Sequence, residues 1–182
     1  MTALSDNLLL ERIGQGDEHS FDTLFYRHYE RVYGLLFRLV GNRVEAEDLA
    51  QELFLKLYQR PFRPGRDHNL SAWLYRVATN MGYNAIRGRK RLWQRNMVLL
   101  PDRSDVPAGP AELVSQAETR AAVQAALAKL PEKQVQLLLL RQMGLSYAEL
   151  AEACHITPAS VGTLLARAGQ AFRKVYQKEE SV

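Results

Sequence analysis

The sequence predicts an all-helical protein made of two small helical domains. Apolar residues recur at positions i, i+3 and i+4 along most of the chain, which is the period of an amphipathic helix, and the alternating pattern of strands is nearly absent. The segment PDRSDVPAGPA at 101–111 holds three prolines, one glycine and two acids, and little in it that packs. We therefore expect one domain at residues 1–98, a flexible linker at 99–114 and a second domain at 115–182.

The distribution of charge favours nucleic acid as a partner. The 182-residue chain has a net charge of +4, but residues 63–95 alone carry eight Lys or Arg and one acid, a net +7, so the remainder sums to −3. Positive charge concentrated in this way suits a polyanion better than it suits an acidic protein surface.

The cysteine content and the apolar runs exclude several other classes of protein. The single cysteine, Cys154, rules out an internal disulfide and a cysteine-based zinc site, fits a reducing cytoplasm, and is expected to be a buried structural thiol. The N-terminal stretch lacks the features of a signal peptide, and every apolar run is too short to cross a bilayer, so no membrane insertion is expected.

Four helices are expected in the first domain. Apolar spacing marks the first two at residues 5–14 and 21–40. Asn42 and Glu45 have the spacing of a capping box that opens the third. Prolines and a glycine then break the chain, and Ser71 is expected to cap the fourth helix.

The fourth helix, residues 71–95, is predicted to carry two different stripes. Its apolar stripe consists of Leu74, Val77, Ala78, Met81 and Ala85. Its polar stripe has cations, carboxamides and a phenol but no acid, and consists of Arg76, Asn80, Tyr83, Asn84 and Arg87. Cations bind phosphates, while amides and planar rings read or stack bases, so this stripe suits nucleic acid. The alternative is a solvated polar face, which the lack of acids disfavours.

The second domain has the pattern of a helix-turn-helix. Ser146 and Glu149 form a capping box that opens a short helix, a brief turn follows at 154–156, and Thr157 and Pro158 open a longer helix. A short helix, a tight turn and a capped second helix are typical of DNA-binding modules. An ordinary helical hairpin is the alternative.

Three motifs in this order resemble the extracytoplasmic-function sigma factors, the compact promoter-specificity subunits of bacterial RNA polymerase. The motifs are AEDLAQELFLKLY at 46–58, NLSAWLYRVATN at 69–80 and LPEKQVQLLLLRQMGLSYAELAEACHITPASVGTLLARA at 130–168. The resemblance implies a sigma region 2 helical bundle followed by a sigma region 4 helix-turn-helix. It also implies a cytoplasmic, non-enzymatic protein without a cofactor or metal. Such a protein recognises minus-ten and minus-thirty-five promoter elements and assists promoter melting, and its partners are core RNA polymerase, promoter DNA and an anti-sigma factor.

The resemblance also implies roles for residues at matching positions. Those expected to bind the clamp helices of the largest polymerase subunits are Asp48, Gln51, Glu52 and Phe54. Those expected at the minus-ten element are Phe62, Arg63, Arg66, Asp67, Asn69, Trp73, Arg76, Asn80, Tyr83, Asn84, Arg87, Arg89, Lys90 and Arg91. Those expected at the minus-thirty-five element, on the module that would also meet the polymerase flap, are Thr157, Ser160, Thr163, Arg167 and Arg173. Trp73 has a core position as its alternative.

The last helix departs from the family pattern. The family usually has basic residues at three positions that are Gly162, Leu164 and Gly169 here, whereas Arg167 matches. Reading of the minus-thirty-five element is therefore expected to be weak, altered, or shifted toward the helix N-terminus, which itself binds phosphate. The family also has glycine in the turn at the position of His155, so a left-handed backbone is expected there.

Two other classes of function stay open on the sequence alone. The first is a helix-turn-helix regulator that binds operators as a dimer, with residues 42–60 as the dimer face. The second is an enzyme, for which Glu152 and His155 have the spacing of a metal-binding pair, but a single copy at a helix end is poor support. The four histidines have no ligand spacing, and no phosphate-binding loop or nucleophile motif is present.

Overall fold

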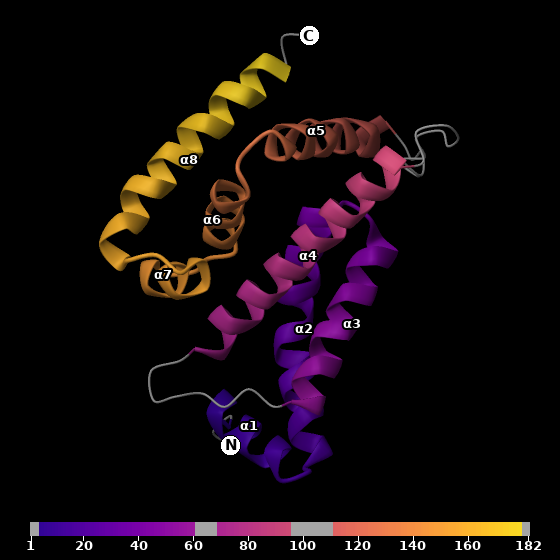
Figure 1. Cartoon of the computed structure of the whole chain (residues 1–182), viewed down its shortest axis with the longest axis vertical. Coiled ribbons are helices and arrows are strands. Elements are labelled where there is room, and N and C mark those ends of the chain that lie inside the picture. The colour runs from indigo at the N-terminus through magenta and orange to yellow at the C-terminus, as the bar shows by residue number, and fades with distance from the viewer. Residues whose placement is uncertain (1–3, 61–68, 96–110, 180–182) are drawn as a thin grey trace.

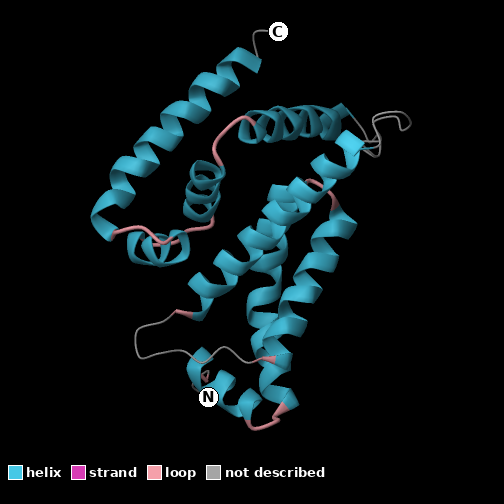
Figure 2. Cartoon of the chain, viewed as in Figure 1, coloured by secondary structure: helices cyan, strands magenta, loops and turns pink. Residues whose placement is uncertain are grey.

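The structure is a computed structural model that describes residues 4–60, 69–95 and 111–179. Within these ranges it consists of eight helices and no strand (Figures 1 and 2), which confirms the all-helical prediction. The helices are α1 (Asp6–Gly14), α2 (Glu18–Val40), α3 (Arg43–Gln59), α4 (Leu70–Arg95), α5 (Ala111–Ala128), α6 (Glu132–Gln142), α7 (Tyr147–Cys154) and α8 (Pro158–Glu179). Residues 111–114, which were expected in the linker, are therefore helical.

Side-chain caps set the boundaries of the first helices. The Ser5 hydroxyl accepts a hydrogen bond from the Leu8 N–H at the start of α1, and the Asp17 carboxylate accepts one from the Ser20 N–H at the start of α2. The α2 helix ends where Gly41 adopts a left-handed conformation, φ 74°, which glycine adopts without steric cost. The next residue, Asn42, caps α3 as predicted, because its Oδ1 accepts from the Glu45 N–H at 2.9 Å. The Glu45 carboxylate, predicted to complete a capping box, accepts from Arg89 at 3.0 Å.

The cap of α4 differs from the prediction. Leu70 is already helical, so Ser71 is the second residue of α4 and not its cap. Asn69 caps the helix instead, because its Oδ1 accepts from the Ser71 N–H at 2.8 Å and its carbonyl oxygen accepts from the Trp73 N–H at 3.1 Å. Asparagine is at least as good a cap as serine, and it precedes Ser71 by two residues.

Helix α2 is the centre of the first module, and α1, α3 and α4 pack around it. The apolar stripe of α4 faces this core: Leu74 and Ala78 are fully buried, and the other members are partly buried against it. Helix α4 lies close to α2 at Gly82, where an added Cβ would lie 3.1 Å from Cδ1 of Leu39. Glycine at this position lets the two helices lie close together.

The second module consists of α5 to α8, with Leu140, Leu150 and Val161 among its fully buried side chains. The predicted capping box is confirmed, because the Ser146 side chain accepts from the Glu149 N–H while the Glu149 carboxylate accepts from the Ser146 N–H. The predicted left-handed turn is also confirmed, since His155 has φ 52° and ψ 53°. Helices α7 and α8 thus form a helix-turn-helix.

The two modules contact each other directly. Helix α4 packs against α7 and, less extensively, against α6, and α2 also contacts α6. Figure 1 shows α6 and α7 beside α4, with α5 and α8 on the side away from α3. We call this arrangement of the two modules the closed arrangement.

Candidate nucleic-acid and partner-binding surfaces

The predicted polar stripe of α4 forms one surface along the helix, separate from the buried apolar stripe. Asn80, Asn84 and Arg87 are exposed, while Arg76 and Tyr83 are partly buried. We define the minus-ten surface as the described members of the predicted set on and just before α4, which are Asn69, Trp73, Arg76, Asn80, Tyr83, Asn84 and Arg87. The predicted residues Phe62, Arg63, Arg66 and Asp67 lie outside the described residues.

Trp73 takes an intermediate position in this surface. It is partly buried and packs against the hydrophobic core, whereas its neighbour Tyr75 is 2% exposed and belongs to the core. The indole ring of Trp73 therefore contributes to the core and is also partly accessible to solvent.

In the C-terminal half of the minus-ten surface, Arg87 is the centre of a polar cluster. Its Nη1 donates to both carboxylate oxygens of Glu132 on α6 at 2.9 Å, and its Nη2 donates to Oδ1 of Asn84 at 2.8 Å. The Tyr83 hydroxyl donates to the backbone carbonyl of Glu132 at 2.8 Å. Burial, together with the nearby Glu132 charge, raises the pKa of Tyr83, so the phenol is protonated and acts as a donor near neutral pH.

The N-terminal half of the surface also meets the second module. The Asn69 N–H donates to Oε1 of Glu152 at 3.2 Å, and its Nδ2 donates to Oε1 of Glu149 at 3.1 Å. Hydrogen bonds from the Ser146 backbone and from Ser146 and Asn69 side chains hold the pKa of Glu149 below its ordinary value. Arg76 Nη1 lies 3.1 Å from Nε2 of His155, a contact in which a neutral imidazole nitrogen accepts from the guanidinium.

The basic residues at the end of α4 divide into two groups. Arg89 binds within its own module, to the Glu45 carboxylate at 3.0 Å and to the Val40 carbonyl at 3.2 Å. Arg89 therefore joins α4 to the corner between α2 and α3. Lys90 and Arg91, the other two basic residues predicted to meet DNA in this last part of α4, are exposed.

The predicted polymerase-binding residues separate into an exposed face and a buried support. Asp48, Gln51 and Glu52 are exposed on α3, and Glu52 pairs with Lys56 at 2.6 Å. Phe54 is only 1% exposed, and its ring centroid lies 4.9 Å from that of Phe25. Phe54 therefore belongs to the core beneath this face. This agrees with its place on the apolar stripe of α3.

Two exposed apolar residues of α3 complete this face, and neither was among the predicted site residues. Leu55 is 54% exposed and Tyr58 is 42% exposed. These two residues line a hollow of about 340 Å³ together with Gln51, Phe21 and Phe25. The acidic residues Glu18 and Asp22 also line this hollow. Leu55 lies off the apolar stripe of its own helix, and that departure is the sequence signal that would have found this face.

The predicted minus-thirty-five residues are arranged along α8. Thr157, Thr163, Arg167 and Arg173 are exposed, and Ser160 is partly buried with its hydroxyl donating to the Thr157 carbonyl at 2.8 Å. The three positions that depart from the family have different environments. Leu164 is partly buried and packs against the core. A Cβ added at Gly162 would lie 3.7 Å from the Tyr147 ring, an ordinary contact distance, and a Cβ added at Gly169 would meet nothing within 4 Å.

The remaining reactive groups have structural roles. Cys154 is 4% exposed at the end of α7, and burial raises the pKa of its thiol to about 11, so it is a structural thiol as predicted. In the part of the chain that the structure describes, no cluster of three or more His, Cys, Asp or Glu side chains has the geometry of a metal site. No described helix is long and apolar enough to cross a membrane.

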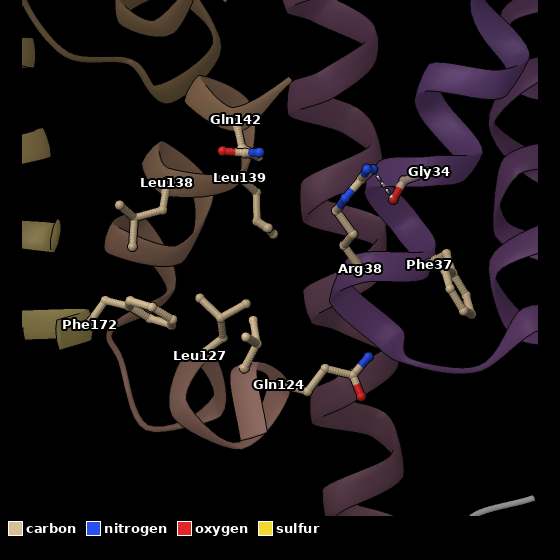
Figure 3. Close-up of a pocket in the computed structure, with 10 residues that line it drawn as sticks. Gly34, Phe37, Arg38, Gln124, Leu127, Leu138, Leu139, Gln142 and Phe172 are labelled. Carbon is tan, nitrogen blue, oxygen red and sulfur yellow. Dashed lines mark hydrogen bonds between the residues drawn. The ribbon is translucent and has the colours of Figure 1, made fainter. Parts of the chain in front are cut away.

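A groove of about 600 Å³ lies between the two modules (Figure 3). Phe37 and Arg38 of α2 line one side, and Leu127, Leu138 and Phe172 from three helices of the second module line the other. The Arg38 guanidinium donates to the Gly34 carbonyl at 2.9 Å on its own helix, as the dashed line in Figure 3 shows. Because both modules form its walls, this groove exists only in the closed arrangement.

Comparison with known proteins assigns a family to both modules. The sigma-70 region 2 family matches residues 24–92, and the sigma-70 region 4 family matches residues 120–171. The chain is 31% identical to the RNA polymerase sigma-H factor of Pseudomonas aeruginosa, over 97% of this chain and 96% of that protein. It is 34% identical to the ECF RNA polymerase sigma factor SigE of Mycolicibacterium smegmatis, over 89% of this chain and 63% of that protein.

Two solved structures have the same fold. CnrH in complex with the cytosolic domain of CnrY aligns with a TM-score of 0.71 at 18% identity, over 95% of this chain and 97% of its own. The sigma factor RpoE in complex with the anti-sigma factor NepR from Bartonella quintana aligns with a TM-score of 0.63 at 23% identity, over 86% of this chain and 96% of its own. From these matches to both modules along nearly its whole length, we conclude that the chain belongs to the extracytoplasmic-function sigma factors, the non-enzymatic promoter-specificity subunits of bacterial RNA polymerase.

Proposed function

We propose that this chain binds core RNA polymerase in the cytoplasm and directs it to promoters by contacts of α4 with the minus-ten element and of α8 with the minus-thirty-five element. The observation that carries this proposal is the minus-ten surface: a stripe of cations, amides and rings without an acid of its own, backed by an apolar stripe buried in the region 2 core. The dimeric regulator is disfavoured because the face from 42 to 60 matches region 2 of sigma factors.

Promoter melting fits the chemistry of this surface. Unstacking a base costs a few kcal/mol, and a protein offsets that cost by holding the separated strand with amides, ring faces and cations. The exposed amides of Asn80 and Asn84 are one helical turn apart, so they meet neighbouring positions on one strand. Lys90 and Arg91 then extend the contact along the phosphates. The protein would trap the open form and would carry out no covalent step.

The α3 face supports binding to the polymerase clamp. Exposed acids at Asp48 and Glu52 flank the apolar side chains of Leu55 and Tyr58, and an acidic border around an apolar hollow suits a basic amphipathic helix. The apolar residues supply the contact energy, and the acids supply orientation and the rate of association. Phe54 supports this face from below and does not touch the partner.

The α7–α8 helix-turn-helix supports a weaker or altered contact with the minus-thirty-five element. Thr157 and Thr163 offer hydroxyls and Arg167 offers an exposed cation, while Leu164 turns toward the core at a position where the family has a basic residue. An anti-sigma factor is the remaining proposed partner, because two proteins of the same fold have been solved in complexes with CnrY and with NepR.

Transcription in vitro with purified core bacterial RNA polymerase tests the proposal. The template is a pool of promoter-bearing fragments from the genome that encodes the chain, with and without the chain. We expect discrete transcripts that depend on the chain, and their start sites will define the promoter motif. Operator binding by the chain alone, with no transcript from a folded protein, would instead establish the dimeric regulator.

A further inference from the structure

The groove between the two modules has the size and the lining of a small-molecule site. Its lining is mostly apolar, with Phe37, Leu127, Leu138 and Phe172 from four different helices, and its volume of about 600 Å³ is in the range of sites that hold small molecules. Among the described residues that line it, Arg38 alone is charged. An apolar site with one cation suits a ligand that has an apolar body and a negative end.

The guanidinium of Arg38 has donors available for such a negative end. Its Nη1 donates to the Gly34 carbonyl at 2.9 Å within α2, and Arg38 forms no ion pair in the part of the chain that the structure describes. A guanidinium carries several N–H donors, so most of them remain available to an oxyanion. Figure 3 shows the guanidinium on the α2 side of the groove, across from Leu139 and Gln142 of α6.

A second cavity, of about 530 Å³, adjoins the groove beside Arg38. The two cavities share Arg38, Gln124 and Leu127 as lining residues, so they are continuous there. The lining therefore changes from apolar in the groove to basic in the cavity, with Arg38 at the junction. The other charged residues described in the lining of the cavity are three cations and one acid, Arg87, Arg89, Lys90 and Glu132.

The cavity has more positive charge than its own contacts neutralise. Arg87 pairs with Glu132 at 2.9 Å, and Arg89 pairs with Glu45 at 3.0 Å. Lys90 forms no ion pair with another described residue. Together with the arginine at the junction, it leaves two cations without an acid. Two cations suit a head group with more than one negative charge, and a guanidinium binds phosphate oxygens through parallel N–H donors.

Gln124 is held in place at the junction. A Cβ added at Gly41, the left-handed residue that ends α2, would lie 3.1 Å from Nε2 of Gln124, so the amide lies directly against the end of that helix. This amide makes no hydrogen bond to another described residue. Its N–H donors are therefore available to the same head group as the guanidinium of Arg38.

We propose that the groove and the adjoining cavity form one binding site for a small amphiphile with a single alkyl chain and a phosphate head. The alkyl chain lies along the apolar wall of the groove, and the phosphate lies at Arg38, with Gln124 and Lys90 beside it. Both modules form the site, so the ligand binds the closed arrangement and stabilises it. The inference does not rest on the proposed function, because its test contains neither DNA nor polymerase.

The hollow on α3 shows what distinguishes this site from an ordinary apolar depression. That hollow is also largely apolar, but Glu18 and Asp22 line it, and no cation is among its described lining residues. Acids disfavour the anionic head that the groove attracts. Amphiphiles of equal chain length and opposite charge therefore distinguish the two places.

Isothermal titration calorimetry of the full chain with octyl phosphate, below the concentration at which micelles form, tests the site. Butyl, hexyl and octyl phosphate vary only the chain, and we expect about tenfold tighter binding from hexyl to octyl because two more CH₂ groups are buried. Inorganic phosphate lacks the chain, and octyltrimethylammonium has the opposite charge. Each is expected to bind about 30-fold more weakly than octyl phosphate.

Variants of the full chain locate the bound ligand. Arg38→Gln removes the cation and is expected to weaken octyl phosphate binding about tenfold, whereas Arg12→Gln, the same change at an exposed arginine of α1, is expected to bind as wild type does. Leu138→Trp fills the groove and is expected to abolish the gain from hexyl to octyl phosphate. Far-UV circular dichroism establishes that each variant is folded, and the chain-length series on the wild type tests the apolar wall without a variant.

Several results would overturn the proposal. The first is the absence of saturable binding of octyl phosphate to the wild type. Equal binding of octyl phosphate by the wild type and by Arg38→Gln, or equal binding of octyl phosphate and octyltrimethylammonium by the wild type, would show adhesion to apolar surface without a site for the head group. A dimer of the chain, measured by sedimentation, that dissociates when octyl phosphate is added would assign the groove to a second copy of the chain.

Discussion

Helices α4 and α8 are the two helices that this sigma factor is proposed to present to promoters, and they differ in how completely they are equipped for it. The α4 stripe has an unbroken series of amides, rings and cations, and its apolar side is buried in the core. In α8, the expected cations are absent at Gly162, Leu164 and Gly169, and Leu164 instead adds to the packing of its module. We infer that recognition is concentrated in the first module.

The same difference is visible in the contacts between the modules. The minus-ten surface is engaged by acids and a histidine of the second module, whereas Arg167 on α8 is exposed. The helix with the larger set of proposed DNA-contacting side chains is therefore also the one that contacts the other module.

The largest expected effect is the loss of stability when a leucine on the buried side of α4 or α8 is truncated. Leu74→Ala on α4 removes a fully buried side chain and is expected to lower the free energy of unfolding by about 3 kcal/mol, whereas Leu164→Ala on α8 removes a partly buried one and is expected to cost about 1 kcal/mol. Urea denaturation of the full chain measures both. Equal losses would mean that Leu164 is as important to the packing of its module as Leu74 is to the packing of the first module.

The next effect concerns the outer side of α4. Asn80→Ala combined with Asn84→Ala is expected to reduce open-complex formation by about 2 kcal/mol, roughly 30-fold, because two amide contacts with the separated strand are lost. Permanganate footprinting of unpaired thymines measures the open complex, and a gel shift measures initial binding by the holoenzyme.

Initial binding is expected to change less than melting in this variant. The exposed amide of Gln59 on α3 provides the control, because Gln59→Ala deletes the same chemical group away from the minus-ten surface. Open-complex yields equal to those of wild type would remove the two asparagines from the melting step and weaken the contrast between α4 and α8.

A smaller effect is expected on the outer side of α8. Arg167→Ala is expected to weaken binding to the minus-thirty-five element by about 1 kcal/mol, roughly fivefold, because it removes one cation from a helix that has few. The measurement is transcription from promoters with the native and with an exchanged minus-thirty-five element, and Lys174→Ala, further along α8, is the control. If the exchange of the element has no effect even with wild-type protein, the second module does not read sequence.

Local features of both modules could be predicted from the sequence because each depends on residues that are close together in the chain. The capping box at Ser146 and Glu149 and the left-handed backbone at His155 were predicted and are confirmed. The cap of α4 was assigned to Ser71 because serine is a good cap, but the sequence pattern does not fix where the first helical turn begins, and Asn69 two residues earlier is an equally suitable cap.

Features that join distant residues could not be predicted. The pair of Arg87 and Glu132 is separated by 45 positions, and no period or motif relates a charge in one module to a charge in the other. Phe54 shows a different difficulty, since the resemblance gave it a role in polymerase binding while its place on the apolar stripe of α3 gave it a role in the core. Only its 1% exposure decides for the core.

The smallest expected effect concerns the turn that positions α8. His155 has φ 52°, a conformation that costs a residue with a Cβ about 1 kcal/mol relative to glycine. His155→Gly and His155→Ala both delete the ring that meets Arg76, so the difference between them reports the backbone alone. We expect the glycine variant to be more stable than the alanine variant by about 1 kcal/mol in urea denaturation. Equal stability of the two variants would mean that the turn relaxes out of the left-handed region at little cost, and that the entry angle of α8 is less firmly fixed than that of α4.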